Sequence, residues 1–190
     1  MNYKTTMNKS LLLLLFVAVF ASACSNDDDP EPENETEIIT RVEMKFTNTL
    51  NPSEVVLAKF NDPDGPGGNA PILTHPTLKS GTVYSVTLEL YNDLEGEDIT
   101  EEIEEEDDEH QFFFIQTGNI FTSIAYADFD AFGKPVGLKS IFTTGAAGTG
   151  TLRVVLRHEP NKSASGVAEG LIANAGGDTD IDITFNVTVQ

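Results

Sequence analysis

Cysteine and basic residues are scarce in this sequence. Cys24 is its only cysteine, and 11 Lys and Arg residues stand against 31 Asp and Glu residues. A lone cysteine excludes a disulfide within the chain, and a domain of ~150 residues buries about 68–70% of its unfolded surface without one. The formal net charge of −20 at pH 7 argues against binding to nucleic acid or anionic lipid, and it favours cations or basic proteins as partners.

A long apolar run is also missing. The longest, residues 11–21, is too short for a membrane-spanning helix, which needs about 20 residues. It follows two lysines and ends in Ala21-Ser22-Ala23, so it predicts an export signal peptide over residues 1–23. This small-residue triplet before Cys24 resembles the lipobox of bacterial lipoproteins, which implies cleavage before Cys24 and acylation of that residue. The alternative is a buried or reactive free thiol.

The residues after Cys24 predict an anchoring segment. Residues 25–29 (SNDDD) are similar to the export signal of lipoproteins from the Bacteroidetes group. That similarity implies an outer-membrane protein displayed on the cell surface, with an orientation towards the periplasm as the alternative. Prolines and repelling carboxylates follow, so residues 24–37 predict a lipidated acidic tether that holds the protein on the membrane through acyl chains. Residues 38–190 remain as a single domain.

Alternating apolar and polar residues dominate this domain. In residues 181–189 every odd-numbered residue is apolar and every even-numbered one is polar, as in a half-buried strand. Seven further stretches, separated by Gly, Asn, Asp and Pro, have strand character: 42–46, 54–60, 84–90, 111–116, 119–127, 136–144 and 150–158. About eight short strands predict an all-β fold, an antiparallel β-sandwich of the immunoglobulin-like or jelly-roll-like kind.

One short helix and the loop positions complete the predicted fold. Residues 98–109 favour a helix with Asp98 or Thr100 as its N-cap, but acidic residues in the last turn oppose the helix dipole, so the helix should be short or frayed. If consecutive strands all run antiparallel, one end of the sandwich carries the connections 48–53, 93–110, 128–135 and 159–178. The loop 61–80 and the tether then lie at the opposite end.

The acidic segment 93–109 is the first candidate site, because 12 of its 17 residues are Asp or Glu. Such dense carboxylates repel each other unless cations or basic partners relieve them. Two histidines are expected beside this segment, and imidazoles with nearby carboxylates suit Zn²⁺ or Cu²⁺. The candidate metal ligands are therefore His110, His158, Glu106, Glu109 and Glu159. The alternative is a solvated acidic loop with two ordinary surface histidines.

Two loops have the spacing of calcium-binding segments. Asp62 and Asp64 alternate before a glycine, and Asp128 and Asp130 begin a second loop of this kind. Phe132 stands where the second loop needs a third oxygen ligand, and neither loop has the bidentate Glu of an EF-hand. Because Gly and Asp are also standard turn residues, ordinary turns are the alternative at both loops.

No motif indicates catalysis, and an enzyme is not expected. There is no GxSxG elbow, no Walker-type phosphate loop, and no cysteine nucleophile once Cys24 is acylated. The glycine-rich stretch 145–150 joins two predicted strands and opens no helix, so it predicts a hairpin turn.

Several longer motifs resemble a single family: ITEE (99–102), DEHQ (108–111), TTGAAG (143–148), LRHEPNK (156–162) and NAGGDTD (174–180). They are similar to motifs of small Bacteroidetes lipoproteins usually filed as type 1 periplasmic binding fold superfamily proteins, over nearly all of residues 38–190. That label implies two doubly wound α/β lobes closing on a small ligand, whereas ~150 residues with almost no helical periodicity predict a sandwich. The resemblance supplies no activity or ligand.

Together these features predict a lipid-anchored binding module. The first hypothesis is capture of a divalent metal ion for an outer-membrane transporter, since the anchor, the acidic segment and the two histidines all fit this role. The second is an adhesion or structural module whose faces contact protein or glycan, since the sequence has no dense, compact ligand motif.

Overall fold

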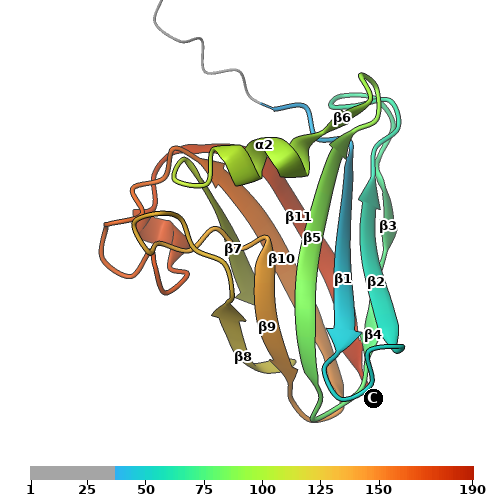
Figure 1. The fold of residues 1–190 in the computed structure, drawn as a ribbon. Coiled ribbons are helices and arrows are strands. Elements are labelled where there is room, and N and C mark those ends of the chain that lie inside the picture. Colours follow the sequence, from blue (N-terminus) through green and yellow to red (C-terminus); the bar gives the residue numbers. More distant parts are fainter. Residues whose placement is uncertain (1–36) are drawn as a thin grey trace, which may run out of the picture. The chain divides into compact units, whose positions relative to one another are not determined.

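The computed structural model describes residues 37–190, which form two β-sheets packed face to face (Figure 1). The predicted antiparallel β-sandwich is confirmed. The predicted signal peptide, Cys24 and the tether as far as residue 36 lie outside the described residues. In the described part, no helix is both long and apolar enough to cross a membrane.

The larger sheet has seven strands. In spatial order they are β3 (Ile72–Thr74), β2 (Val55–Asn61), β1 (Arg41–Asn48), β5 (Val83–Asn92), β9 (Lys139–Thr144) and β8 (Phe121–Tyr126), with β6 (Glu97–Asp98) paired to β5. The smaller sheet runs in the order β4 (Thr77–Leu78), β11 (Asp178–Val189), β10 (Gly148–His158) and β7 (His110–Gln116). All eight predicted strands are present. The three additional strands, β3, β4 and β6, have only two or three residues each, too few for a periodic signal.

The alternating strands point their apolar side chains into one core. In β11 the odd-numbered residues from Ile181 to Val189 are buried and the even-numbered ones are exposed. Phe142 lies at the centre of an aromatic cluster, with edge-on contacts to Phe46 and Phe121 at ring-centroid distances of 5.8 and 5.0 Å. Such edge-to-face pairs add stability beyond the apolar area they bury.

The outer face of the smaller sheet is also covered at one end. The loop 159–177 packs there, and its Val167 and Ala175 form a second buried cluster with Phe113 and Val155 of the sheet. Because β7 is thereby covered on both faces, its first four residues are all buried and it lacks the alternation of β11.

The helix α2 (Ile99–Glu105) closes one end of the sandwich (Figure 1). It is short, as predicted, and it begins at Asp98, whose side chain accepts a hydrogen bond from the backbone N–H of Thr100. Thr100 in turn uses its hydroxyl to bridge the backbone of Leu90 in β5. Ile99 and Ile103 are buried, so the helix forms a lid on the core.

The strand directions correct part of the loop prediction. Connections 93–110, 128–135 and 159–178 share one end, as predicted. However, β1 runs antiparallel to β5, because the short strands β3 and β4 run in the same direction and add one reversal between β2 and β5. The connection 48–53 therefore lies at the other end, and the described chain begins beside the acidic segment. The loop 61–80 also starts at this end, because Asn61 pairs with Arg41. The prediction that this loop and the entry of the tether lie at the end opposite the acidic segment is therefore wrong.

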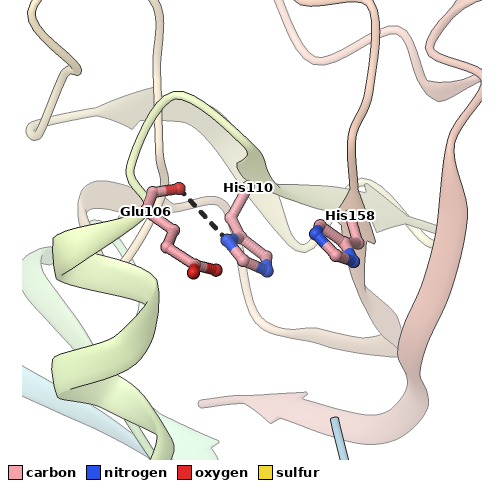
Figure 2. Close-up of side chains that lie close together, drawn as sticks. All are labelled: Glu106, His110 and His158. Carbon is pink, nitrogen blue, oxygen red and sulfur yellow. Dashed lines mark hydrogen bonds between the residues drawn. The ribbon is translucent and has the colours of Figure 1, made fainter. Parts of the chain in front are cut away.

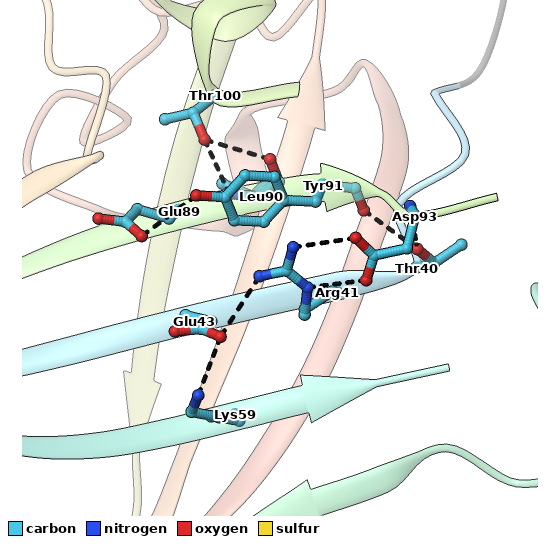
Figure 3. Close-up of polar contacts among 9 residues, drawn as sticks. All are labelled: Thr40, Arg41, Glu43, Lys59, Glu89, Leu90, Tyr91, Asp93 and Thr100. Carbon is cyan, nitrogen blue, oxygen red and sulfur yellow. Dashed lines mark hydrogen bonds and ion pairs between the residues drawn. The ribbon is translucent and has the colours of Figure 1, made fainter. Parts of the chain in front are cut away.

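A network of polar contacts holds Thr40 and Arg41, at the beginning of β1, at this end (Figure 3). The backbone N–H of Thr40 donates to the carbonyl of Tyr91, and the Thr40 hydroxyl accepts from the N–H of Asp93 at 2.8 Å. Arg41 forms two hydrogen bonds with the Asp93 carboxylate, at 2.7 and 2.9 Å, and its guanidinium lies 3.8 Å from the centre of the Tyr91 ring. These contacts fix the position from which residue 37 reaches the neighbouring site.

Candidate metal-binding site

Two histidines meet across the end of the smaller sheet. His110 is the first residue of β7 and His158 the last of β10, and the antiparallel register places them directly opposite each other. Their rings are stacked, with centroids 4.7 Å apart and planes at 6° (Figure 2). The sequence prediction that these histidines share one end of the sandwich is confirmed, and both rings lie beside Glu106.

The His110 ring is fully buried and its orientation is fixed. Its Nδ1 lies 3.1 Å from the backbone carbonyl of Glu106, and because a carbonyl can only accept, Nδ1 carries a proton and donates it (Figure 2). Its Nε2 lies 3.1 Å from Oε1 of Glu37, within ion-pair distance but without hydrogen-bond geometry. Burial acts to lower the pKa of His110, but Glu37, the Glu106 carbonyl and Asp180 outweigh it and raise the pKa.

The His158 ring lies at the edge of the same cluster. Its side chain is 12% exposed, and Nε2 lies 3.7 Å from the Glu109 carboxylate. Its Nδ1 is buried and has no hydrogen-bond partner in the described part of the chain. The next residue, Glu159, has a left-handed backbone with φ of 49°, which is uncommon for a residue other than glycine. Its N–H donates to the Glu109 carbonyl, so the turn brings both carboxylates to His158.

Carboxylates surround the two rings. Within residues 37–190, four groups of three residues have potential ligand atoms within 4.8 Å of one another: Glu106–His110–His158, Glu37–His110–Asp180, Glu109–His158–Glu159 and Glu37–Glu102–Glu106. All five metal ligands predicted from the sequence belong to these groups, and three further residues, Glu37, Glu102 and Asp180, join them. Glu102 lies one helical turn before Glu106, a spacing visible in the sequence.

Asp180 reaches the cluster because of a β-bulge. The pairing of β11 with β10 shifts register between Leu156 and Arg157, whose partners are Ile181 and Thr179, so Asp180 has no partner residue. A bulge redirects the side chain at such a position. Strict alternation would turn Asp180 outward together with Asp182, and this is why the sequence pattern did not identify it. Both of its carboxylate oxygens are buried and lack hydrogen-bond partners among the described residues.

The cluster has more negative charge than its two histidines can balance. Burial and then the charge of Glu37 raise the pKa of Asp180 to about 6. Burial, Glu37 and Glu106 likewise raise the pKa of Glu102. Of the ten buried side-chain atoms without a hydrogen-bond partner in residues 37–190, five belong to Glu37, His110, His158 and Asp180. Because such groups are costly to bury, their concentration makes this cluster the first candidate for a cation site in the described part of the chain.

The second predicted calcium loop is organised differently. Asp128 accepts hydrogen bonds from the backbone N–H groups of Gly137 and Lys139, and Asp130 accepts from those of Phe132 and Lys134. The Asp130 carboxylate also lies 3.1 Å from the buried ammonium of Lys162. A lysine thus supplies the positive charge here, which argues against calcium at this loop.

The first predicted calcium loop has fewer contacts to its carboxylates. Asp64 accepts two hydrogen bonds from Asn69, and Asp62 is buried with one oxygen lacking a partner in the described part of the chain. Neither residue belongs to a ligand group of three among the described residues. Calcium binding at this loop stays a prediction.

Comparison with known proteins gives no family. No protein-family model matches the chain, and no curated protein matches it. What the cluster binds must therefore be inferred from its own geometry and chemistry.

Proposed function

We propose that this protein is a lipid-anchored outer-membrane lipoprotein whose domain binds a divalent transition-metal ion at the cluster around His110 and His158. The observation that carries the proposal is the His110 ring, which is held by the Glu106 carbonyl at Nδ1, while its Nε2 has no hydrogen-bond partner among the described residues and lies 3.1 Å from the Glu37 carboxylate. Metal-binding histidines are oriented in this way, with the second ring nitrogen donating to a carbonyl or carboxylate.

The donor atoms favour particular ions. Imidazole nitrogens with carboxylate oxygens suit Zn²⁺ and Cu²⁺, whereas Cu⁺ prefers sulfur ligands and Ca²⁺ prefers a shell of oxygens. Two ligands bonded at 2.0–2.1 Å to one tetrahedral ion lie about 3.3 Å apart. The 3.1 Å between His110 Nε2 and Glu37 Oε1 is close to that spacing. The wider groups, with atoms up to 4.8 Å apart, would contract on binding.

The remaining parts of the proposal come from the sequence. The predicted lipid anchor on Cys24 would keep the ion at the membrane, and the net charge of −20 would concentrate cations near the domain. A binding module of this kind would pass its ion to an outer-membrane transporter. The resemblance to small Bacteroidetes lipoproteins is in keeping with this role and names no ligand.

The test is calorimetric titration of residues 25–190 with Zn²⁺, Cu²⁺ and Ca²⁺. This chain keeps every core residue, since both buried clusters lie within residues 39–189. We expect binding of Zn²⁺ or Cu²⁺ that the double variant His110→Ala/His158→Ala weakens at least tenfold. His75→Ala is the matched control, because His75 contacts Asn186 and belongs to none of the ligand groups. Failure to bind any divalent ion more tightly than millimolar would refute the proposal.

A second candidate function is adhesion to protein or glycan. The loop between β8 and β9 exposes two aromatic side chains, Phe129 at 56% and Phe132 at 76%. Exposed aromatics are common in recognition surfaces. A chain that binds no metal but loses attachment to intact cells or glycan surfaces in the variant Phe129→Ala/Phe132→Ala would favour this role.

A further inference from the structure

The residue just before the sandwich lies inside the cluster. The Glu37 side chain is only 7% exposed, its Oε1 lies 3.1 Å from the Nε2 of His110, and its Oε2 is buried without a partner in the described chain. An ionised glutamate is more stable in water than in a protein interior, so a glutamate that follows a polar, acidic segment would be expected to be exposed. Its burial beside other carboxylates is unfavourable unless a positive charge joins them.

Three separate parts of the chain meet at this point. Glu37 comes from the segment before β1, His110 from the start of β7 and Asp180 from the bulge in β11, and one potential ligand atom of each lies within 4.8 Å of the others. The bulge redirects Asp180 towards this point, and both Asp180 oxygens lack partners among the described residues. Glu37 and Asp180 thus supply negative oxygens on either side of an imidazole whose orientation is fixed.

We propose that Glu37 is a ligand of the bound ion, together with His110 and Asp180, so that metal binding fixes the anchoring segment to the domain. This inference rests on the proposed metal-binding function and assigns the residue through which the ion acts on the rest of the chain. An ion at this point would connect the N-terminal segment with both β7 and β11 of the smaller sheet.

The position of Glu37 has a consequence for the membrane. Glu37 lies thirteen residues after Cys24, and a fully extended chain spans at most ~3.3–3.6 Å per residue. The Cα atom of Glu37 therefore lies no more than about 47 Å from that of Cys24, the predicted site of acylation. An ion bound by Glu37 would then stay within reach of a transporter in the same membrane.

The test compares two single variants of residues 25–190. Glu37→Gln removes the proposed ligand and keeps the shape of the side chain. Glu105→Gln removes the same charge from α2, where Glu105 is exposed and belongs to none of the ligand groups. Zn²⁺ affinity is measured by calorimetry, and hydrogen exchange of the peptide covering residues 37–40 is measured with and without Zn²⁺. Urea unfolding without metal shows whether each variant folds.

We expect Glu37→Gln to weaken Zn²⁺ binding at least tenfold and Glu105→Gln to change it less than threefold. Zn²⁺ should slow exchange in residues 37–40 of the unsubstituted chain and of Glu105→Gln, but not of Glu37→Gln. If Glu37→Gln proves unstable, Asp180→Asn takes its place in the test, and it should also weaken Zn²⁺ binding at least tenfold. Unchanged Zn²⁺ affinity in Glu37→Gln, or exchange that Zn²⁺ does not slow, would overturn this inference and leave the proposed function standing. Absence of Zn²⁺ binding by the unsubstituted chain would overturn both.

Discussion

The buried pair of Lys162 and Asp130 gives a stability prediction that does not depend on any metal. The Lys162 ammonium lies 3.1 Å from the Asp130 carboxylate, with side chains only 5% and 0% exposed, and it also donates to the backbone carbonyl of Asp107. It thereby ties the loop 159–177 to the loop after β8 and to the segment after α2. We expect Lys162→Met to destabilise the domain substantially, because the substitution leaves a buried carboxylate without its cation.

The magnitude follows from burial. Removing one partner of a buried ion pair costs about 3–5 kcal/mol, because the remaining charge stays away from water. Asp130 keeps its two backbone hydrogen bonds, from Phe132 and Lys134, and Met fills much of the lysine stem, so the lower end of the range, about 3 kcal/mol, is expected. The double variant Lys162→Met/Asp130→Asn should recover part of the loss, since Asn still accepts hydrogen bonds and carries no charge.

Lys139 provides a matched control. Its ammonium lies at the same distance, 3.1 Å, from the Glu104 carboxylate, but these side chains are 57% and 52% exposed. Exposed pairs contribute about 0–1 kcal/mol, so Lys139→Met should change stability by no more than that. The assay is urea unfolding followed by circular dichroism, since the chain has no tryptophan to report by fluorescence. Equal losses in the two variants would refute the assignment of the difference to burial.

Three further predictions concern pH, backbone and ligands. Burial opposes ionisation of Asp130, but the N–H of Lys134 and the Lys162 ammonium outweigh burial and lower the pKa of Asp130. The contribution of Asp130 to the free energy of unfolding is therefore complete above its unfolded pKa of ~3.9 and is lost as pH falls through its lower folded pKa. In urea unfolding across this pH range, the free energy of unfolding should decline less for Asp130→Asn than for the unsubstituted chain. Gly177→Ala should weaken Zn²⁺ binding in calorimetry, because its Cβ would lie 2.2 Å from the His158 carbonyl oxygen, whereas Gly176→Ala meets no atom within 4 Å and should only strain the backbone. Glu106→Gln should weaken Zn²⁺ binding at least tenfold and Glu105→Gln should not; equal affinities would remove the Glu106 carboxylate from the site.

The sequence predicted the sandwich because its long strands follow one rule, the alternation of apolar and polar residues. Alternation in residues 181–189 needs only one buried face, and the structure buries that face over the whole stretch. The rule says nothing about strands of two or three residues, so β3, β4 and β6 had no signal. Because β3 and β4 run in the same direction, their omission removed one reversal between β2 and β5 and placed the beginning of β1 at the wrong end.

The strand pattern could locate some residues of the candidate site but not others. His110 and His158 were predictable at one end of the sandwich, because His110 precedes one predicted strand and His158 ends another. Their direct pairing follows from the register of β7 and β10, which the sequence did not predict. Glu37 was assigned to the tether, since the composition around it is that of an unfolded segment, and composition does not reveal a single buried contact. Asp180 was not identified, because the alternation that predicted β11 places its side chain on the outer face, and only the bulge turns it towards the site.

The irregular backbone positions at the candidate site show how it differs from the rest of the sandwich. Asp180 lies at a bulge, Glu159 has a left-handed backbone and Glu106 caps a helix of seven residues whose last turn is acidic. A left-handed backbone at a residue other than glycine and acidic side chains in the last turn of a helix both cost stability. All three departures bring a carboxylate towards the same pair of imidazoles. Irregular backbone that serves packing would not be expected to gather like charges, and the convergence of these carboxylates is the arrangement that the proposed cation site requires.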